Sequence, residues 1–221
     1  MLVLALDTSS AAVSAALVEL AGSAVTPRAQ HHTINERGHG EYLTPLIAEC
    51  LTDAGASPKD LAAIVAGVGP GPYTGLRVGL VTAAVLSECR GIPAYGVCSL
   101  DGIAAEAQDE GDLIVMTDAR RNEVYWARYD GQGDRVDGPY VSRPALVPTG
   151  GIKHIAGAGA RKYRELFPEF TLIGPDNPDP VALAGWATDR IIAGAPPDPL
   201  TPLYLRRPDA VEPGARKRTT P

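Results

Sequence analysis

The chain has 221 residues, 45% of them apolar and 21% charged, which is the composition of an ordinary globular protein with a core of Ala, Val and Leu. Its formal net charge of -6 argues against a protein that grips a nucleic acid over its whole surface, because phosphate contacts need clustered Lys and Arg. The length favours one unit of two lobes. Residues 206–221 are an exception, with five Lys and Arg against two acidic residues, and we expect a flexible, solvated tail there.

Cysteine usage and the N-terminal residues both indicate a cytoplasmic protein. Cys50, Cys89 and Cys98 are odd in number and form no C-x-x-C pair, so neither a disulfide framework nor a zinc ribbon is predicted. The first apolar run has no basic flank and stops at Asp7. No stretch approaches the ~20 apolar residues of a membrane span.

The first third of the chain predicts a three-stranded meander followed by a helix. Apolar runs over residues 2–7 and 11–20 flank a short polar turn, and a more polar strand falls within residues 25–33. A helix is expected to begin between residues 38 and 42, with Pro45 in its first turn or at a kink. Its apolar stripe has i, i+3, i+4, i+7 spacing: Leu43, Leu46, Ile47, Cys50, Leu51 and Ala54.

The next segment completes a β-β-β-α-β-α-β half. A buried strand is predicted over residues 62–69, a helix over 76–89 that Gly91 stops, a strand over 92–97, and a helix over 99–107 capped by Ser99. The helix over 76–89 has no broad polar face, so we expect it to be buried on two sides.

A second lobe is predicted to start near Asp112. The runs DLIVMTDAR and NEVYWARYD indicate two paired strands, and HIAGAGA followed by RKYRELF indicates a strand that turns into a helix. Residues 180–195 read as a further amphipathic helix. The predicted lobes are residues 1–100 and 101–205.

The glycine- and proline-rich segment GVGPGPYTGLRVGL, residues 67–80, is interpreted as a docking surface and not as an active site. A phosphate-binding loop is excluded because the spacing G-x-x-x-x-G-K-[ST] fails and no Lys follows. What remains is a mechanical role: glycines permit close backbone approach, prolines stiffen the turn, and Tyr73 or Thr74 begins the helix.

Two other turns have both a structural and a functional interpretation. Asp7, Thr8 and Ser9 end a buried strand, where they either form a plain hairpin turn or face a phosphate, with Asp7 holding magnesium through water. Gly157 and Gly159 lie between a strand and a helix, where a structural turn is favoured over a nucleotide site because the third glycine of a dinucleotide fingerprint is missing.

Histidine and arginine patterns point to no reaction on their own. His31, His32, His39 and His154 form no H-E-x-x-H or H-x-x-x-H pair, so we expect them to be solvated or satisfied. Arg120 and Arg121 follow a strand that ends in Asp118. They either reach an anionic ligand in a cleft between lobes or form a solvated hairpin.

Several motifs, in this order and spacing, resemble the bacterial TsaB (YeaZ) family: LALDTSSAAVSAALVE, HGEYLTPLI, GVGPGPYTGLRVGL, IPAYGVCSLDGIA, DARRNEVYWARYD and the late PLYLR. The resemblance implies a two-lobed α/β fold of the actin, Hsp70 and sugar-kinase type (ASKHA, RNase H-like), with a mixed sheet and helices on both faces in each lobe. It also implies an accessory role beside the related enzyme TsaD, which places threonylcarbamoyl on an adenosine of tRNA, while the ATPase TsaE completes the assembly.

The resemblance also implies that this chain is not the enzyme. Where TsaD-like proteins carry H-M-E-G-H, this chain has Ser99, Leu100, Asp101, Gly102 and Ile103. Ser99 is a poor metal ligand and Ile103 is none, so neither metal-binding histidine is present. We therefore expect no catalytic residue, no metal and no cofactor of its own, with ATP or ADP expected, if anywhere, at the interface of the complex.

By the same resemblance, two helices are expected to pack against TsaD as a bundle, and against a second copy of this chain when TsaD is absent, with tRNA contacted only indirectly. The expected partner-interface residues are His39, Tyr42, Leu43, Leu46, Ile47, Gly71, Tyr73, Thr74, Gly75, Leu76, Arg77, Val78 and Leu80.

Three alternatives remain open at this point. One is an independent ATPase or small-molecule kinase of the same fold, for which the chain lacks a convincing general base. A more remote one is a metallopeptidase, which the missing ligands contradict. The third concerns the basic tail alone, which adds either nothing or a weak attraction to tRNA.

Overall fold

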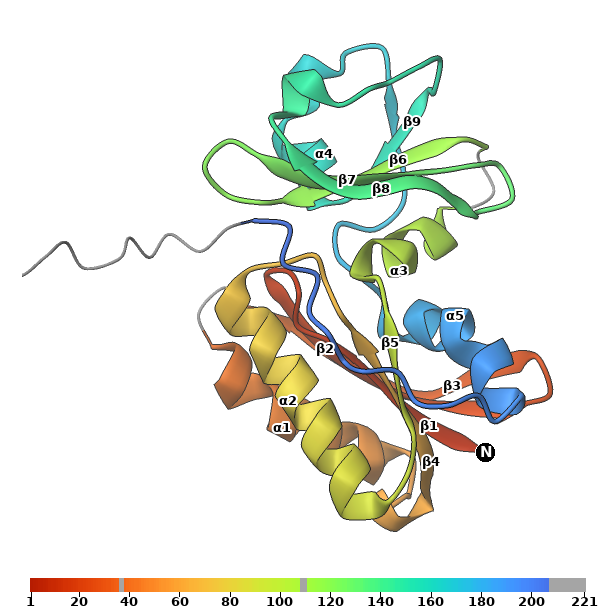
Figure 1. Ribbon diagram of the computed structural model, residues 1–221. Coiled ribbons are helices and arrows are strands. Elements are labelled where there is room, and N and C mark those ends of the chain that lie inside the picture. Colours follow the sequence, from red (N-terminus) through yellow and green to blue (C-terminus); the bar gives the residue numbers. More distant parts are fainter. Residues whose placement is uncertain (36–37, 108–110, 207–221) are drawn as a thin grey trace, which may run out of the picture.

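The computed structural model describes residues 1–35, 38–107 and 111–206, and it has two lobes, each built on one five-stranded mixed sheet (Figure 1). The sheet of the first lobe has the order β3-β2-β1-β4-β5. Strands β1, β2 and β3 are antiparallel neighbours, whereas β4 and β5 run parallel to β1. The bounds are β1 Leu2–Asp7, β2 Ala12–Ala21, β3 Ala24–Ile34, β4 Leu61–Gly67 and β5 Ala94–Val97.

Helices cover both faces of this first sheet. Helices α1 (His39–Asp53) and α2 (Tyr73–Arg90) pack on one face, and α5 (Pro180–Ile192) packs on the other. Side chains of β1 alternate between the two layers: Leu4 and Leu6 join the core under α1 and α2, while Val3 and Ala5 join the core under α5. Because both faces are buried, β1 needs an uninterrupted apolar run.

The sheet of the second lobe has the order β10-β9-β6-β7-β8. Helix α3 (Ser99–Glu106) packs on one of its faces, and α4 (Ala158–Lys162) lies against β6. Its strands are β6 Leu113–Asp118, β7 Val124–Tyr129, β8 Arg135–Ser142, β9 His154–Ala156 and β10 Thr171–Leu172. Short 3-10 turns are η1 Pro58–Asp60 in the first lobe and η3 Pro144–Leu146 and η4 Arg164–Leu166 in the second.

The predicted two-lobed α/β fold is confirmed, including the meander and the β-β-β-α-β-α-β half. Pro45 lies inside α1, and Gly91 ends α2 with a left-handed φ of 61°. Among the residues described, no helix is long and apolar enough to span a membrane. The predicted basic tail lies outside the described residues except for Arg206.

Two expectations from the sequence are wrong. Residues 101–205 do not form the second lobe alone, because α5 and the segment after it return to the first sheet, where Leu183, Ala184 and Ala187 complete the core. Ser99 does not cap α3 either. It is the first residue of that helix, Cys98 holds the cap position, and the Ser99 hydroxyl instead donates to Asp7.

Candidate functional site

The turn after β1 is closed around the carboxylate of Asp7. This side chain is 1% exposed and accepts hydrogen bonds from Ser99 Oγ at 2.5 Å, from Ser9 Oγ at 2.7 Å and from the Ser9 backbone N–H at 2.8 Å. Burial raises the pKa of Asp7 above its usual value, and the hydrogen bonds from Ser99 and Ser9 oppose that shift. The carboxylate faces the interior, so the geometry favours the structural turn over a magnesium or phosphate contact at Asp7.

Thr8 and Ser9 hold the glycine-rich loop against this turn. Thr8 Oγ1 donates to Gly75 O at 2.8 Å and accepts from the Gly79 N–H at 3.0 Å. A Cβ at Gly79 would overlap Thr8 Oγ1, and one at Gly71 would overlap Ser9 O. The predicted close backbone approach in this loop is therefore confirmed.

Gly157 and Gly159 allow a similar approach in the second lobe. Gly157 has a φ of 95°, and a Cβ there would overlap the carbonyl oxygen of Met116. A Cβ at Gly159 would lie 2.8 Å from the Thr117 carbonyl carbon. Both glycines let α4 pack directly on β6, which is the structural interpretation of this turn.

A cleft of about 680 Å³ separates the lobes. The β1–β2 turn, the beginnings of α1 and α2, the end of β6 and helix α4 form its walls. Thr117 is 7% exposed, and its Oγ1 has no hydrogen-bond partner. Lining residues with polar or charged side chains include Ser9, Ser10, Thr74, Thr117, Asp118, Arg120, Lys162, Asn177 and Arg206.

The cations at the cleft differ in how they are held. Lys162 Nζ lies 3.0 Å from Asp118 Oδ2, and this carboxylate raises the pKa of Lys162. Arg120 lines the cleft, whereas Arg121 is not among its lining residues. Arg120, Arg121 and Asn122 have left-handed φ angles of 61°, 50° and 60°. This conformation costs roughly 1–2 kcal/mol for each arginine, whereas Asn adopts it more readily.

The histidines are solvated or satisfied, as the sequence predicts. His39 is 8% exposed, and its Nε2 lies 2.8 Å from Ser10 O. His31 Nε2 lies 2.7 Å from Asp53 Oδ2 on the surface. His32 is exposed, and His154 is half-buried at the start of β9.

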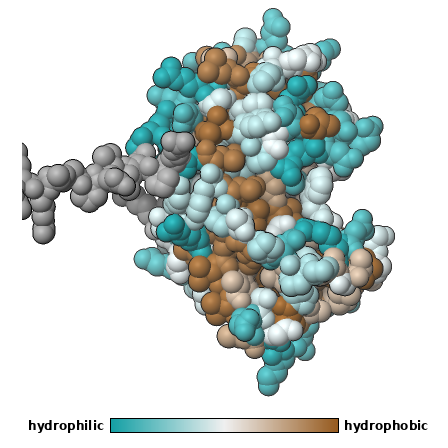
Figure 2. Space-filling model, viewed as in Figure 1, coloured by the Kyte–Doolittle hydropathy of each residue, from teal (hydrophilic) through white to brown (hydrophobic). Residues whose placement is uncertain are grey.

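The outer side of α2 carries exposed apolar side chains next to exposed polar ones such as Arg77 and Glu88. Its inner side is buried through Gly75, Leu76, Gly79, Leu80 and Ala83, but Val81 is 59% exposed and Val85 54%. Together with half-buried Val78 these two valines follow i, i+3, i+7 spacing, and we call the three residues the α2 face. Figure 2 shows apolar atoms gathered on the first lobe, in the region where α2 lies in Figure 1.

The predicted partner interface needs correction in its membership. Five of its residues lie in the core of the first lobe and are at most 8% exposed, so a partner cannot reach them: Leu43, Leu46, Ile47, Leu76 and Leu80. Gly71 and Gly75 are buried against the β1–β2 turn, and His39 lines the cleft. The residues that remain at least partly accessible are Tyr42, Tyr73, Thr74, Arg77 and Val78.

Residues 99–103, which the resemblance compares with H-M-E-G-H, are buried and hydrogen-bonded within the chain. Ser99 Oγ also accepts from the Gly69 N–H at 3.1 Å, and Ile103 is fully buried in the second-lobe core. Asp101 is 4% exposed, accepts from Tyr129 OH at 2.8 Å and lies 3.3 Å from Arg135 Nε. Within residues 1–35, 38–107 and 111–206, no three His, Cys, Asp or Glu side chains gather to hold a metal ion.

Sequence reasoning missed two features near the cleft. One is the Asp118–Lys162 ion pair, which joins residues 44 apart in sequence. The other is the packing of Tyr204 on Tyr73, with ring centroids 4.2 Å apart. The PLYLR motif contains Tyr204 and marks this segment as distinctive, but its sequence does not predict which residue Tyr204 contacts.

Comparison with known proteins places the chain in a family. A family model described as TsaD, tRNA N6-adenosine threonylcarbamoyltransferase, matches residues 26–170. An uncharacterised protein of Mycobacterium tuberculosis is 46% identical over 211 residues, covering 94% of this chain and 93% of that protein. The tRNA threonylcarbamoyladenosine biosynthesis protein TsaB of Bacillus subtilis is 35% identical over 130 residues, or 58% of this chain and 55% of TsaB.

The structural comparison agrees with this placement. YeaZ from Pseudomonas aeruginosa matches with a TM-score of 0.78 and 28% identity, over 92% of this chain and 99% of YeaZ. The two lobes, and not one sheet alone, are therefore shared. The chain belongs to the TsaD family and, within it, is a member of the TsaB (YeaZ) group.

Proposed function

We propose that this protein is a non-catalytic accessory subunit in the biosynthesis of threonylcarbamoyladenosine on tRNA, and that it binds and activates TsaD. The observation that carries the proposal is the uncovered α2 face on a chain of the TsaB group. Two valines more than half exposed on one helix side form a continuous apolar stripe, which is typical of a protein interface.

TsaD is the proposed occupant of the α2 face because it belongs to the same family as this chain. A relative with the same arrangement of lobes can offer an equivalent helix, and two apolar helix faces bury each other by ridges-into-grooves packing. The same face serves a homodimer when TsaD is absent, since an isologous contact uses one patch twice. TsaE joins this pair in a larger assembly in the cytoplasm, and tRNA is contacted mainly by the partners because the body of this chain is acidic.

The non-catalytic part of the proposal has its own support. The Asp7 carboxylate is enclosed by its hydrogen bonds to Ser9 and Ser99. Ile103 is buried where a metal-binding histidine would be needed. Neither position offers a group that can touch a substrate, so the chain acts on the reaction through TsaD.

The binding test compares two valines of equal exposure. Val81 on α2 and Val136 on β8 are each 59% exposed, so Val136→Glu adds the same charge at an equally exposed valine away from the α2 face. Burying the glutamate in an apolar interface costs several kcal/mol, so Val81→Glu should weaken TsaD binding at least about 100-fold. Val136→Glu should bind TsaD like the wild type. Equal affinities for both variants, measured by calorimetry or interferometry, would refute docking through the α2 face.

A second candidate function is nucleotide binding in the cleft, either by the isolated chain or, as ATP or ADP, at the interface of the complex. The unpaired Thr117 Oγ1 and the cations Arg120 and Lys162 favour an anionic ligand there. Thr74 and Val78 line the cleft and also lie on the outer part of α2, so a nucleotide would be bound beside the docked partner. Calorimetry with magnesium-ATP, on the chain alone and with TsaD, tests this candidate. Micromolar binding that Lys162→Ala abolishes would support it, and no heat in either titration would remove it.

A further inference from the structure

The segment after α5 contacts both lobes in turn, and the proposed function gives it no task. It first follows the edge of the first sheet, where the Asp198 N–H donates to Ala94 O at 3.1 Å and Asp198 Oδ2 accepts from the Gly96 N–H at 3.2 Å. Arg190 of α5 pairs with the same carboxylate. In Figure 1 this segment runs across the first lobe and ends between the beginning of α2 and the second lobe.

We call residues 200–206 the strap. Its side chains pack into two separate cores. Leu200 and Tyr204 pack against the first-lobe core that lies under α1 and α2. Leu203 packs against the second-lobe core that contains Leu113 and Tyr129. The Leu203 N–H donates to Val68 O at 2.8 Å, which anchors the strap where its side chains diverge.

An aromatic cluster fixes the strap to the first turn of α2. The Tyr204 ring stacks on Tyr73 with centroids 4.2 Å apart and an angle of 27° between the rings. Arg77 Nε donates to Tyr204 OH at 2.9 Å, and its guanidinium lies 5.7 Å from the centroid of each ring. Stacked rings and a guanidinium beside their faces attract one another, so these contacts hold Tyr204 against α2.

Arg206 then reaches the second lobe across the cleft. Its carbonyl oxygen accepts from Tyr73 OH at 2.8 Å, while its guanidinium donates to Ala119 O at 3.1 Å and lies 3.5 Å from Glu123. Ala119 and Glu123 flank the hairpin between β6 and β7. Arg206 therefore connects Tyr73, the first residue of α2, to the β6–β7 hairpin of the second lobe.

We infer that the strap is an interlobe clamp that sets the angle between the two lobes and keeps the cleft at its present width. Opening the cleft separates Tyr73 from the β6–β7 hairpin, so it must break either the Tyr73–Tyr204 stack or the contacts of Arg206. A domain contact of a few such interactions is weak enough to open and close, so its loss should change the distribution of lobe angles without unfolding either core.

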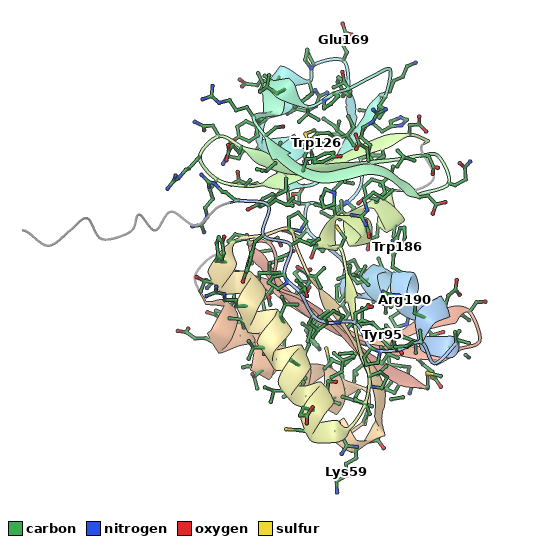
Figure 3. The ribbon with its side chains drawn as sticks, in the orientation of Figure 1. Lys59, Tyr95, Trp126, Glu169, Trp186 and Arg190 are labelled. Atoms are coloured by element: carbon green, nitrogen blue, oxygen red, sulfur yellow. The ribbon has the colours of Figure 1, made fainter. Side chains whose placement is uncertain are left out.

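Lys59 and Glu169 suit a distance measurement because both are exposed and lie at opposite ends of the molecule (Figure 3). Spin labels on Lys59→Cys and Glu169→Cys, in a Cys89→Ser background, report the separation of the lobes in the free protein. The wild type should give one narrow distance distribution. Arg206→Ala and Tyr204→Ala should each add a second, separate population, and Tyr204→Phe, which keeps the stack, should restore most of the narrow one.

The control removes residues 207–221 and leaves the strap intact, so its distribution should match the wild type. Far-ultraviolet circular dichroism establishes that each variant is folded. Arg206→Ala changes only a partly exposed side chain at the end of the strap and should fold even if Tyr204→Ala does not. A narrow, unshifted distribution in Arg206→Ala would overturn the clamp, as would broadening by the tail deletion alone.

Discussion

Ser99 Oγ donates a 2.5 Å hydrogen bond to Asp7 Oδ2 across 92 residues of sequence. The bond joins the end of β1 to the start of α3, and so it ties the first sheet to the element that leads into the second lobe. The Ser99 side chain is buried and satisfies the buried Asp7 carboxylate, so this bond is part of the packing between the two lobes.

Replacing Ser99 with Ala should destabilise the protein by about 2 kcal/mol or more, because its hydrogen bonds to the buried Asp7 carboxylate and from the Gly69 N–H are both lost. Burial already raises the pKa of Asp7 above 3.8, and loss of the Ser99 bond raises it further. Ionised Asp7 is then less tolerated in the folded state, so the cost of Ser99→Ala should be larger at pH 8 than at pH 4. Urea unfolding at the two pH values measures this difference.

Ser57→Ala is the matched control for that experiment. Ser57 Oγ donates to Asp60 Oδ2 at 2.7 Å, the same kind of contact as that of Ser99, but in an exposed capping box. It should cost less than Ser99→Ala at pH 8 because water can replace the lost bond. A Ser99→Ala cost that is equal at both pH values, or larger at pH 4, would contradict the account of Asp7.

Two glycine substitutions should have effects of opposite sign. A Cβ at Gly67 would overlap Asp7 Oδ2 and lie 2.6 Å from Ser99 Oγ, so Gly67→Ala should cost about 3 kcal/mol or more by disrupting a buried network. Gly185 lies inside α5, and a methyl group there would meet no neighbouring residue within 4 Å, so Gly185→Ala should stabilise by about 0.5–1 kcal/mol through helix propensity. Thermal unfolding measures the stability of both variants relative to the wild type. A Gly67→Ala protein as stable as the wild type would refute the packing described around Asp7 and Ser99.

The three cysteines should react very differently. Burial raises the pKa of the Cys50 thiol to about 11 and that of Cys98 to about 12, so both stay protonated and enclosed at pH 8. Cys89 is exposed on α2. Mass spectrometry after iodoacetamide treatment of the native protein should find Cys89 alone modified, with all three modified in urea. Fast native labelling of Cys98 would be incompatible with its position in the second-lobe core.

The sequence predicts the strands and most helices of this fold because their apolar periods are local. The sequence does not predict which surface the apolar side of a helix packs against. The resemblance predicts that Leu43, Leu46 and Ile47 contact a partner, yet α1 buries these side chains against its own sheet. Likewise, the local sequence of α5 does not predict that this helix packs on the sheet of the first lobe.

The site was harder to predict than the fold for the same reason. Glycine-rich spacing indicated close backbone approach, and the structure places Gly71 and Gly79 against the β1–β2 turn. The α2 face could be expected from the missing polar side of that helix, but its exposed members Val81 and Val85 emerge only once the inner side is known. The strap has no periodicity at all, because its side chains serve two different cores.

The central claim is that this chain acts on tRNA only through TsaD, by way of the α2 face. The most direct measurement is the amount of threonylcarbamoyladenosine formed on unmodified tRNA by purified TsaD and TsaE, with the threonylcarbamoyl donor and ATP supplied, and with this protein added as wild type, Val81→Glu or Val136→Glu. The wild type and Val136→Glu should support modification, whereas Val81→Glu and omission of the protein should give little or none. Full modification without the protein or with Val81→Glu, or modification by this protein in the absence of TsaD, would contradict the account.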